Sequence, residues 1–448
     1  MAAMAIFIIG AEMLLLYFLV LISLLAIKNS KFKTFAMVKI LFKNTFLFLL
    51  ITLVSCGRSS GQNKEVAQTT PDTSSNIIVG ANRTSDYLPL LKDKKVGIVG
   101  NQSSVIFNSE ITEGENATYT HLVDSLVSLK VNVKKVFAPE HGFRGNADAG
   151  EHVKDGKDPK TGLHVISLYG DNKKPKPEQL KDLDVLIFDI QDVGARFYTY
   201  ISSLHYVMEA CAENNVKLII LDRPNPNGHY VDGPILDTAF QSFVGMHPIP
   251  VVHGLTMGEY AKMINGEKWL KDGVQCDLTV ISLQNYSHQS AYSLPIKPSP
   301  NLPNDKAINL YPSLCFFEGT NVNAGRGTDK QFQVFGSPSL SNTYFDYSYI
   351  PESKEGAKSP KHLGEKCYGR DLTSTSRLDQ INLSWLIEAY NNTNSKAGFF
   401  NNFFSKLAGS NELQSQIESG LSEKEIRATW APGLEKFKAI RAQYLLYK

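Results

Sequence analysis

Cysteine and several short site motifs are rare or missing in this sequence. Only five of its 448 residues are cysteine and no CxxC pair occurs, so a zinc site has little support. The sequence also lacks four short motifs of common enzyme classes: GxSxG, GxGxxG, GxxxxGK[ST] and HExxH. Their absence removes support for a serine hydrolase, a dinucleotide enzyme, a P-loop NTPase and a zincin. We expect no cofactor, and a metal site at His141, His253 and Asp222 is a minority alternative.

Positive charge is also scarce once the N-terminal region is set aside. The formal net charge is +2, but five lysines and one glutamate precede Cys56. The rest of the chain has 41 basic and 43 acidic side chains, a net charge near −2. Proteins that bind nucleic acid usually carry a basic surplus, so we expect no nucleic-acid partner. With 43% hydrophobic and 20% charged residues, the composition favours a globular protein with sizeable cores.

Two apolar stretches precede Cys56. Residues 4–27 are long enough to span a bilayer, and residues 45–54 follow two lysines and end just before Ser55 and Cys56. A basic region, a short apolar region and a small residue before a cleavage point are typical of a secretory signal. The residues Leu-Val-Ser-Cys resemble a bacterial lipobox. We therefore expect an exported lipoprotein, anchored to a membrane through lipid on Cys56, that faces the periplasm or the cell surface.

Met37 stands where such a signal would begin, so we expect the first 36 residues to be an over-extended start. The alternative is a genuine N-terminal membrane helix. The signal and lipobox region then comprises residues 1–56. Residues 57–76 are mostly Ser, Thr, Gln and Gly, which is typical of a flexible tether.

From residue 94 to about residue 283, short β-branched runs alternate with amphipathic helical patterns. The predicted strands are 96–99, 133–138, 164–168, 185–190, 217–221 and 278–283. The predicted helices are 120–129, 202–214 and 256–269, the last with the spacing of a capping box at its start. Continuous apolar strands that alternate with helices indicate an α/β fold with a doubly wound, mainly parallel, Rossmann-like sheet.

We expect this Rossmann-like domain to occupy residues 77–286 and a second, smaller α+β domain to occupy residues 287–448. A proline-rich stretch at 295–304 marks the passage between them. Helical patterns recur at 383–391, 397–408 and 423–447. A cleft between two domains is the default place for an active site.

Polar loops follow four of the predicted strands, at 101–102, 139–145, 191–196 and 222–226. In doubly wound sheets the ligand crevice lies outside the carboxyl ends of the strands. Glu140 is the best candidate for a general acid or base, because it follows a buried strand with His141 and Arg144 close by. The alternative is a structural carboxylate that caps the loop and pairs with Arg144.

Three further carboxylates deserve comparison. Asp189 still lies inside its predicted strand, so we expect it to be structural. Asp192 is either a second catalytic carboxylate or the cap of the next helix. Glu318 belongs to a long loop with three glycines, 317–329, and such loops are more often functional than not.

These motifs resemble those of the exo-β-N-acetylmuramidase family, the NamZ-like glycoside hydrolases. The resemblance rests on PEHGFRG at 139–145, FDIQDVGARFYTY at 188–200, DRPNP at 222–226, PSPN at 298–301 and FEGTN with GRGTD at 317–329. It covers the chain from about residue 94 to the C-terminus. It implies release of terminal N-acetylmuramic acid from the non-reducing end of peptidoglycan fragments. It also implies an active-site cleft against a smaller second domain, with the catalytic glutamate at Glu140.

Glycosidases usually use two carboxyl groups, and Glu318 and Asp192 are our candidates for the second. Their distance from the first decides between retention and inversion. The lactyl carboxylate of the substrate requires a cation, and the candidates are Arg144, Arg196 and Arg326. The remaining contacts to the sugar are expected from His141, Tyr198, Asn301, Asn321 and Asp329.

A non-catalytic sugar-binding lipoprotein is the main alternative, because two α/β lobes around a cleft also describe solute receptors. A receptor would tolerate Glu140→Gln as a modest change in affinity, whereas an acid/base catalyst would lose turnover by orders of magnitude. A metal-dependent hydrolase or esterase is a third possibility, and chelators would abolish its activity.

Overall fold

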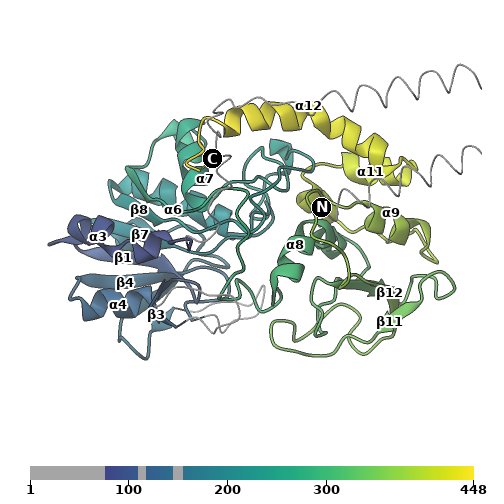
Figure 1. The fold of residues 1–448 in the computed structure, drawn as a ribbon, viewed down its shortest axis with the longest axis horizontal. Helices are drawn as coiled ribbons and strands as arrows, with labels where there is room; N and C mark the ends of the chain where they lie inside the picture. The colour runs from purple at the N-terminus through teal and green to yellow at the C-terminus, as the bar shows by residue number, and fades with distance from the viewer. Residues whose placement is uncertain (1–75, 109–117, 145–154, 448) are drawn as a thin grey trace, which may run out of the picture. The chain divides into compact units, whose positions relative to one another are not determined.

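The computed structural model describes residues 76–108, 118–144 and 155–447. These belong to one compact unit, residues 73–448 (Figure 1). The predicted signal and lipobox region lies outside the described residues. It includes Met37, Cys56 and the apolar stretches at 4–27 and 45–54. Within the described residues, no helix has the length and apolar character needed to cross a bilayer.

A seven-stranded sheet forms the centre of the first part of the chain. Its order is β5-β6-β4-β1-β7-β8-β9, and all pairs are parallel except β5 with β6. Six of these strands confirm the predicted ones to within two residues. The strands are β1 (Val96–Gly100), β4 (Val133–Ala138), β5 (Gly156–Lys157), β6 (His164–Ser167), β7 (Val185–Asp189), β8 (Lys217–Leu221) and β9 (Leu278–Ile281).

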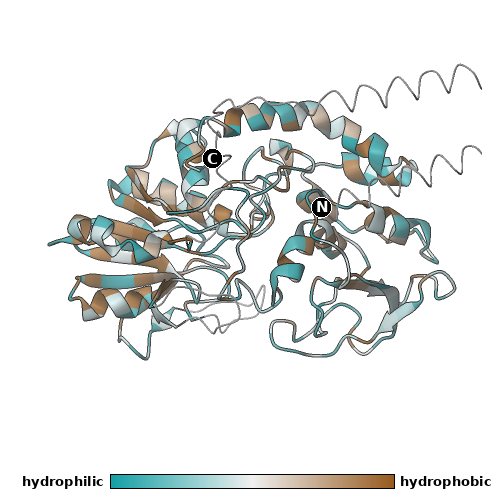
Figure 2. Cartoon of the chain, in the orientation of Figure 1, coloured by the Kyte–Doolittle hydropathy of each residue, from teal (hydrophilic) through white to brown (hydrophobic). Residues whose placement is uncertain are grey.

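Helices cover both faces of this sheet, as the apolar strands require. Successive residues of β7 alternate between two cores, because Leu186 and Phe188 join one and Val185 and Ile187 join the other. The first core includes side chains of α6 (Tyr200–Asn214) and α7 (Met257–Gly266), and the second includes α4 (Leu122–Ser128). Figure 1 places α6 and α7 on one side of the sheet and α4 on the other, and Figure 2 colours the strands between them largely brown, for hydrophobic.

The predicted helix at 256–269 begins as expected. Thr256 accepts a hydrogen bond from the backbone N–H of Glu259, whose carboxylate accepts one from the N–H of Thr256. The helix predicted at 120–129 begins later, at Leu122. Residues 119–121 instead form β3 (Tyr119–His121), which pairs with β2 (Val105–Phe107), so cross-strand pairing displaces the first helical turn.

The second part of the chain is built on α8 (Asp305–Leu314) and a small antiparallel sheet. That sheet has the order β10-β12-β11. Its strands are β10 (Val334–Ser337), β11 (Tyr347–Tyr349) and β12 (Cys367–Asp371). The α/β fold class with a smaller second sheet is therefore confirmed, while the boundary at residues 286–287 stays a prediction.

Four helices follow the small sheet. They are α9 (Ser384–Asn391), α10 (Phe404–Ala408), α11 (Glu412–Glu418) and α12 (Glu423–Arg441). Only the last five residues of the pattern at 397–408 are helical. The stretch before them pairs with the loop at 320–321 instead, since Phe400 forms a bridge with Thr320 and Phe399 accepts a backbone hydrogen bond from Asn321.

The shorter elements complete the fold. They are α3 (Thr84–Tyr87), α5 (Pro177–Leu180), and the 3-10 turns η1 (Gly80–Asn82), η2 (Leu88–Leu91), η3 (Thr238–Phe240), η4 (Lys271–Gly273) and η5 (Cys315–Gly319). Helix α12 returns the chain to the first part. There Arg441 donates to the carbonyl of Gly254, and the hydroxyl of Tyr447 donates to Asp222 at 2.6 Å.

The cap of α4 is expected to make the fold sensitive to acid. His121 Nδ1 accepts a hydrogen bond from the N–H of Val123, and His121 Nε2 lies 3.0 Å from the carbonyl oxygen of Asn101. This pairing requires a neutral ring with the proton on Nε2. Burial, reinforced by the charge of Arg144, lowers the pKa of His121 to about 4.

Because this pKa lies below its ordinary value, the unfolded chain binds more protons than the folded chain between roughly pH 6.5 and pH 4. The free energy of unfolding therefore falls as pH falls, by about 3 kcal/mol at most for this group. A His121→Asn variant keeps a capping side chain but does not titrate. Urea unfolding at several pH values measures the free energy of unfolding of both proteins. The excess of the wild-type value over the variant value should shrink as pH falls, and an excess that does not change with pH would contradict the prediction.

Candidate active site

A cleft of about 1330 Å³ lies where loops after the central strands meet the second part of the chain. Glu140 follows β4, and Tyr198 and Thr199 follow β7. The facing wall includes Glu318 and Arg326. Six of the predicted site residues line this cleft: Glu140, His141, Tyr198, Asn301, Glu318 and Arg326.

Glu140 sits in a tight turn that directly follows β4. The backbone N–H of Gly142 donates to the carbonyl of Pro139, and both His141 (φ 71°) and Gly142 (φ 77°) adopt the left-handed conformation. Non-glycine residues adopt this conformation uncommonly, although histidine does so more often than most, and such residues are found at active sites among other places. The turn ends the strand and places Glu140 and His141 at the cleft.

Two hydroxyl groups contact the carboxylate of Glu140. Thr199 Oγ1 donates to Glu140 Oε2 at 2.6 Å. The Tyr169 phenol also forms a hydrogen bond with this carboxylate; its pKa is raised by burial first and then by the charge of Glu140. The carboxylate is thus fixed by donors from the loops after β6 and β7 while it lines the cleft.

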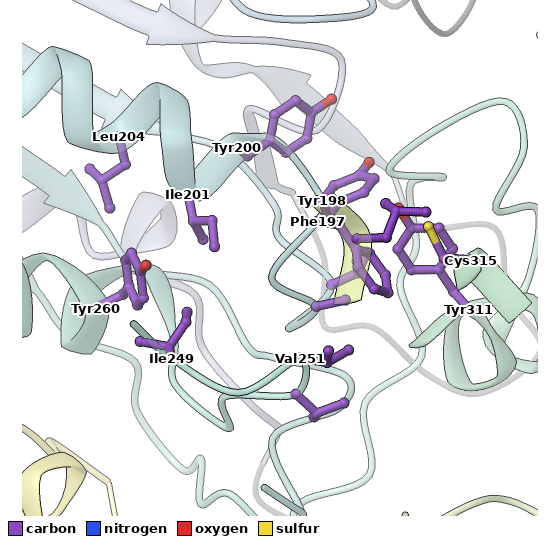
Figure 3. Close-up of a cluster of buried hydrophobic side chains, with 14 of the residues drawn as sticks. Phe197, Tyr198, Tyr200, Ile201, Leu204, Ile249, Val251, Tyr260, Tyr311 and Cys315 are labelled. Atoms are coloured by element: carbon purple, nitrogen blue, oxygen red, sulfur yellow. The ribbon is translucent and has the colours of Figure 1, made fainter. Parts of the chain in front are cut away.

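A buried network supports the backbone of Glu140. Tyr200, the first residue of α6, accepts a hydrogen bond from Asn101 Nδ2 at 2.8 Å, and its oxygen lies 3.5 Å from the carbonyl oxygen of Glu140. The rings of Tyr200 and Tyr198 are 4.8 Å apart, and Tyr198 is 5.9 Å from Tyr311 of α8. Figure 3 displays these three tyrosines at the junction of the two parts.

The facing wall carries a charged cluster. Arg326 Nε donates to Glu318 Oε1 at 2.7 Å, while the terminal nitrogens of Arg326 have no hydrogen-bond partner among the described residues. Burial by itself would raise the pKa of Glu318, but the charges of Arg326 and Lys361 lower it. Glu318 is therefore an ionised carboxylate at the cleft. Lys361 is held by the carbonyls of Phe317, Thr320 and Val322.

Asn301 offers an unsatisfied acceptor. Its Nδ2 donates to the carbonyl of Gly356 at 2.7 Å, whereas its buried Oδ1 has no partner within the described part of the chain. Buried polar atoms without partners are uncommon and often mark a ligand contact. An N–H or hydroxyl group of a bound sugar would satisfy this oxygen.

Asp192 requires a correction, because it does not line the cleft. It is buried, and its Oδ2 accepts the N–H of Gly194 at 2.8 Å in the loop after β7. Burial raises the pKa of Asp192 to about 7. It therefore caps the turn after β7 and not the next helix, because α6 begins only at Tyr200. Asp189 likewise lies inside β7 and pairs with Arg223 at 2.6 Å, as expected for a structural residue.

The expected roles of Arg144 and Arg196 also need correction. Arg144 pairs with Asp124 at 3.0 Å and with Asp158 at 2.9 Å, so it fastens the loop of Glu140 rather than reaching the cleft. Arg196 is fully buried. Its guanidinium donates to four backbone carbonyls, those of Pro234, Ile249, Leu407 and Ala408. Arg326 alone of the three candidates lines the cleft.

Asn321 and Asp329 lie outside the cleft lining as well. The backbone carbonyl of Asn321 accepts from His362 Nε2 at 2.6 Å, and its neighbour Asn323 takes the place at the cleft. Asp329 is exposed and pairs with Lys354 at 2.6 Å beside a separate hollow of about 600 Å³. The loop at 317–329 therefore reaches the cleft through Glu318, residues 322–324 and Arg326, while Asn321 and Asp329 do not line it.

The candidate metal ligands serve other purposes. Asp222 accepts hydrogen bonds from Thr256 Oγ1 and the N–H of Gly258, which fixes the start of α7. His253 is buried, and burial lowers its pKa to about 3. Among residues 76–108, 118–144 and 155–447, no three His, Cys, Asp or Glu side chains gather as a metal site would require.

Sequence reasoning missed Tyr169, Thr199 and Lys361. Tyr169 follows the end of β6, so the rule that led to Glu140 could have identified it. Thr199 lies within the motif at 188–200, between two tyrosines that offer more obvious contacts to a sugar. Nothing in the sequence around Lys361 signals that it folds under the loop of Glu318.

Comparison with known proteins identifies the family. A family model described as exo-beta-N-acetylmuramidase NamZ, N-terminal, matches residues 96–306, and its C-terminal counterpart matches residues 309–447. The chain belongs to this family. It is accordingly a glycoside hydrolase, as predicted.

Individual relatives agree with the family assignment. The peptidoglycan beta-N-acetylmuramidase NamZ of Bacillus subtilis (strain 168) is 37% identical over 381 residues, which is 81% of this chain and 89% of that protein. Two DUF1343 family crystal structures from Bacteroides fragilis NCTC 9343 have similar folds. The first is 47% identical with a TM-score of 0.75, and the match covers 84% of this chain and 99% of that structure. The second is 28% identical with a TM-score of 0.69, and the match covers 83% of this chain and 99% of that structure.

The hydroxyl of Thr199 is expected to matter for catalysis. Thr199→Val keeps the shape but removes the donor to Glu140, so kcat should fall about tenfold or more, given that hydrogen bonds to charged groups contribute roughly 1.5–3 kcal/mol. Thr199→Ser keeps the donor and should retain most activity. Steady-state kinetics of both variants measure this; equal losses would assign the effect to packing.

Proposed function

We propose that this chain releases terminal N-acetylmuramic acid from the non-reducing end of peptidoglycan fragments, with Glu140 as its acid/base residue. The observation that carries the proposal is the position of Glu140, which lines the cleft at the end of β4 while Thr199 and Tyr169 orient its carboxylate. Peptidoglycan is named for the Bacillus subtilis relative, which supports the same class of substrate here.

In this mechanism Glu140 donates a proton to the glycosidic oxygen as the bond to the anomeric carbon breaks. The positive charge that develops on the sugar ring then requires an anion and a nucleophile. With Asp192 outside the cleft, Glu318 is the remaining candidate for the second carboxylate. Arg326 and Lys361 keep it ionised, which suits a group that attacks the sugar or activates water.

Arg326 is proposed to bind the lactyl carboxylate that distinguishes N-acetylmuramic acid from N-acetylglucosamine. Its terminal nitrogens lie free of hydrogen-bond partners among the described residues, and its guanidinium lies 5.1 Å from the ring centroid of Phe332. A guanidinium offers a carboxylate two parallel hydrogen bonds. Asn301 Oδ1 and His141 remain the proposed contacts for the N-acetyl and hydroxyl groups.

The principal test is a Glu140→Gln variant assayed on a chromogenic N-acetylmuramic acid glycoside. We expect kcat to fall by about 10²–10⁴, because the amide cannot donate the proton as an acid does. Asp192→Asn, a matched change outside the cleft, should lose far less. Tight sugar binding with no turnover by the wild type would move the protein to the receptor class.

Glu318→Gln tests the second carboxylate in the same assay. A loss of about 100-fold or more is expected, because the amide cannot attack the sugar or accept a proton from water. Activity within twofold of wild type would remove Glu318 from the mechanism. NMR can then identify which anomer of the sugar forms first. Retention indicates attack by Glu318, and inversion indicates that Glu318 activates water.

Arg326→Met is expected to lower discrimination between N-acetylmuramic and N-acetylglucosamine glycosides. A charge-assisted contact contributes roughly 1.5–3 kcal/mol, so the ratio of the two kcat/KM values should fall about tenfold or more. Arg326→Lys keeps the charge and should lie between wild type and Arg326→Met. An unchanged ratio in Arg326→Met would exclude the carboxylate contact.

We also propose that the chain is exported and anchored through lipid on Cys56, which would hold the enzyme beside its substrate. The proposal rests on the lipobox-like residues before Cys56 and the polar stretch that follows. Cells expressing the chain and grown with labelled fatty acid should yield labelled, membrane-bound protein. Cys56→Ala should abolish the label; equal labelling of both would contradict the anchor.

A further inference from the structure

The cleft has a closed end and an open edge. At the closed end its lining is buried, as at Asn301, Tyr311 and Phe332, whereas elsewhere on the facing wall Arg326 is half-buried and Lys358 is exposed. The edge after β6 is different, because Tyr169 and the loop to Lys173 are half-buried or exposed, as is the facing loop of Phe243. An enzyme that removes a terminal sugar needs a closed end for that sugar and an exit for the rest of the chain.

Glu140 marks the border between the two regions. The Tyr169 phenol contacts its carboxylate, and the Tyr169 ring lies 6.2 Å from the ring of Phe243. The Phe243 ring in turn lies 6.3 Å from that of Tyr206 on α6, at an angle of 18°. Three half-buried aromatic rings thus form a continuous row that begins at Glu140.

Lys173 adds an uncommitted positive charge to this edge. Its ammonium lies 4.9 Å from the ring centroid of Phe243, and it has no hydrogen bond or ion pair with any residue in the described part of the chain. The adjacent Lys174 is different, because it pairs with Glu209 and Glu213 at 2.7 Å. A cation held over an aromatic ring remains free to bind an anion.

The volume of the cleft also exceeds the need of one sugar. At about 1330 Å³ it is larger than the roughly 300–1,000 Å³ typical of small-molecule sites. Space therefore remains beyond the closed end for part of the departing chain.

We propose that Tyr169, Phe243 and Lys173 form the binding site for the leaving saccharide. The aromatic rings pack against the apolar face of a sugar ring, and the Lys173 ammonium pairs with a carboxylate on the leaving chain. The carboxylate belongs either to the lactyl group of a further muramic acid or to an attached peptide. This inference rests on the proposed function, since it assumes that Glu140 protonates the glycosidic oxygen.

The test uses the full-length chain in detergent and four substrates that share one terminal N-acetylmuramic acid. They are the glycosyl fluoride, which has no leaving sugar; the disaccharide with N-acetylglucosamine; the peptide-free tetrasaccharide with alternating sugars; and the tetrasaccharide with peptides on its inner muramic acid. For Phe243→Ala, the ratio of kcat/KM for the disaccharide to that for the fluoride should fall about tenfold. Tyr344→Ala, which removes an exposed ring outside the cleft, should leave this ratio unchanged.

Lys173→Met tests the charge. A fall of about tenfold in the ratio of tetrasaccharide to disaccharide kcat/KM assigns the lactyl carboxylate to Lys173, and a fall only with the peptide-bearing substrate assigns the peptide. If both Phe243→Ala and Lys173→Met hydrolyse the fluoride and keep the wild-type ratios of kcat/KM, the proposed binding site for the leaving saccharide is overturned. Failure of the wild type on all four substrates would instead overturn the proposed function.

Discussion

The cleft depends on hydrogen bonds to one proline carbonyl. The stretch at 295–304 contains four prolines, which have no N–H to donate, so it cannot be fixed by an ordinary backbone ladder. The carbonyl of Pro298 instead accepts from the Tyr198 hydroxyl at 2.8 Å and from Gln102 Nε2 at 3.1 Å, and the Tyr200 oxygen lies 3.4 Å away. These donors follow β1 and β7, so the strand ends position the segment that carries the chain into the facing wall.

The same tyrosines link this junction to the loop of Glu140. Because Tyr200 contacts the carbonyls of both Pro298 and Glu140 and accepts from Asn101, a shift of any one group disturbs the others. Asn101 is tied in turn to the cap of α4 through His121. Buried networks of this kind are rigid when every member has a partner. The geometry of Glu140 is therefore set by residues from four separate stretches of the chain.

Short apolar runs predicted the strands because the inner strands β1 and β7 are buried throughout, and the outer strands keep an apolar segment beside polar or half-buried residues. The rule that ligands bind at the carboxyl ends of parallel strands pointed to Glu140, which does line the cleft, while its catalytic role stays a prediction. The predictions for Arg144 and Arg196 failed, because an arginine that follows a strand looks the same in the sequence in both cases. Its guanidinium can face a cleft or donate to acceptors inside the protein. Partner choice depends on contacts distant in sequence, such as those of Arg196 with Leu407 and Ala408.

Arg196 has a consequence for motion. Its buried guanidinium joins carbonyls at 234 and 249 to carbonyls at 407 and 408, and no carboxylate of the described residues pairs with it. Rotating the two walls apart would leave several donors unpaired in an apolar interior, at about 1–3 kcal/mol for each. A solute receptor relies on such a rotation to enclose its ligand. The four hydrogen bonds of Arg196 oppose such a rotation in this molecule.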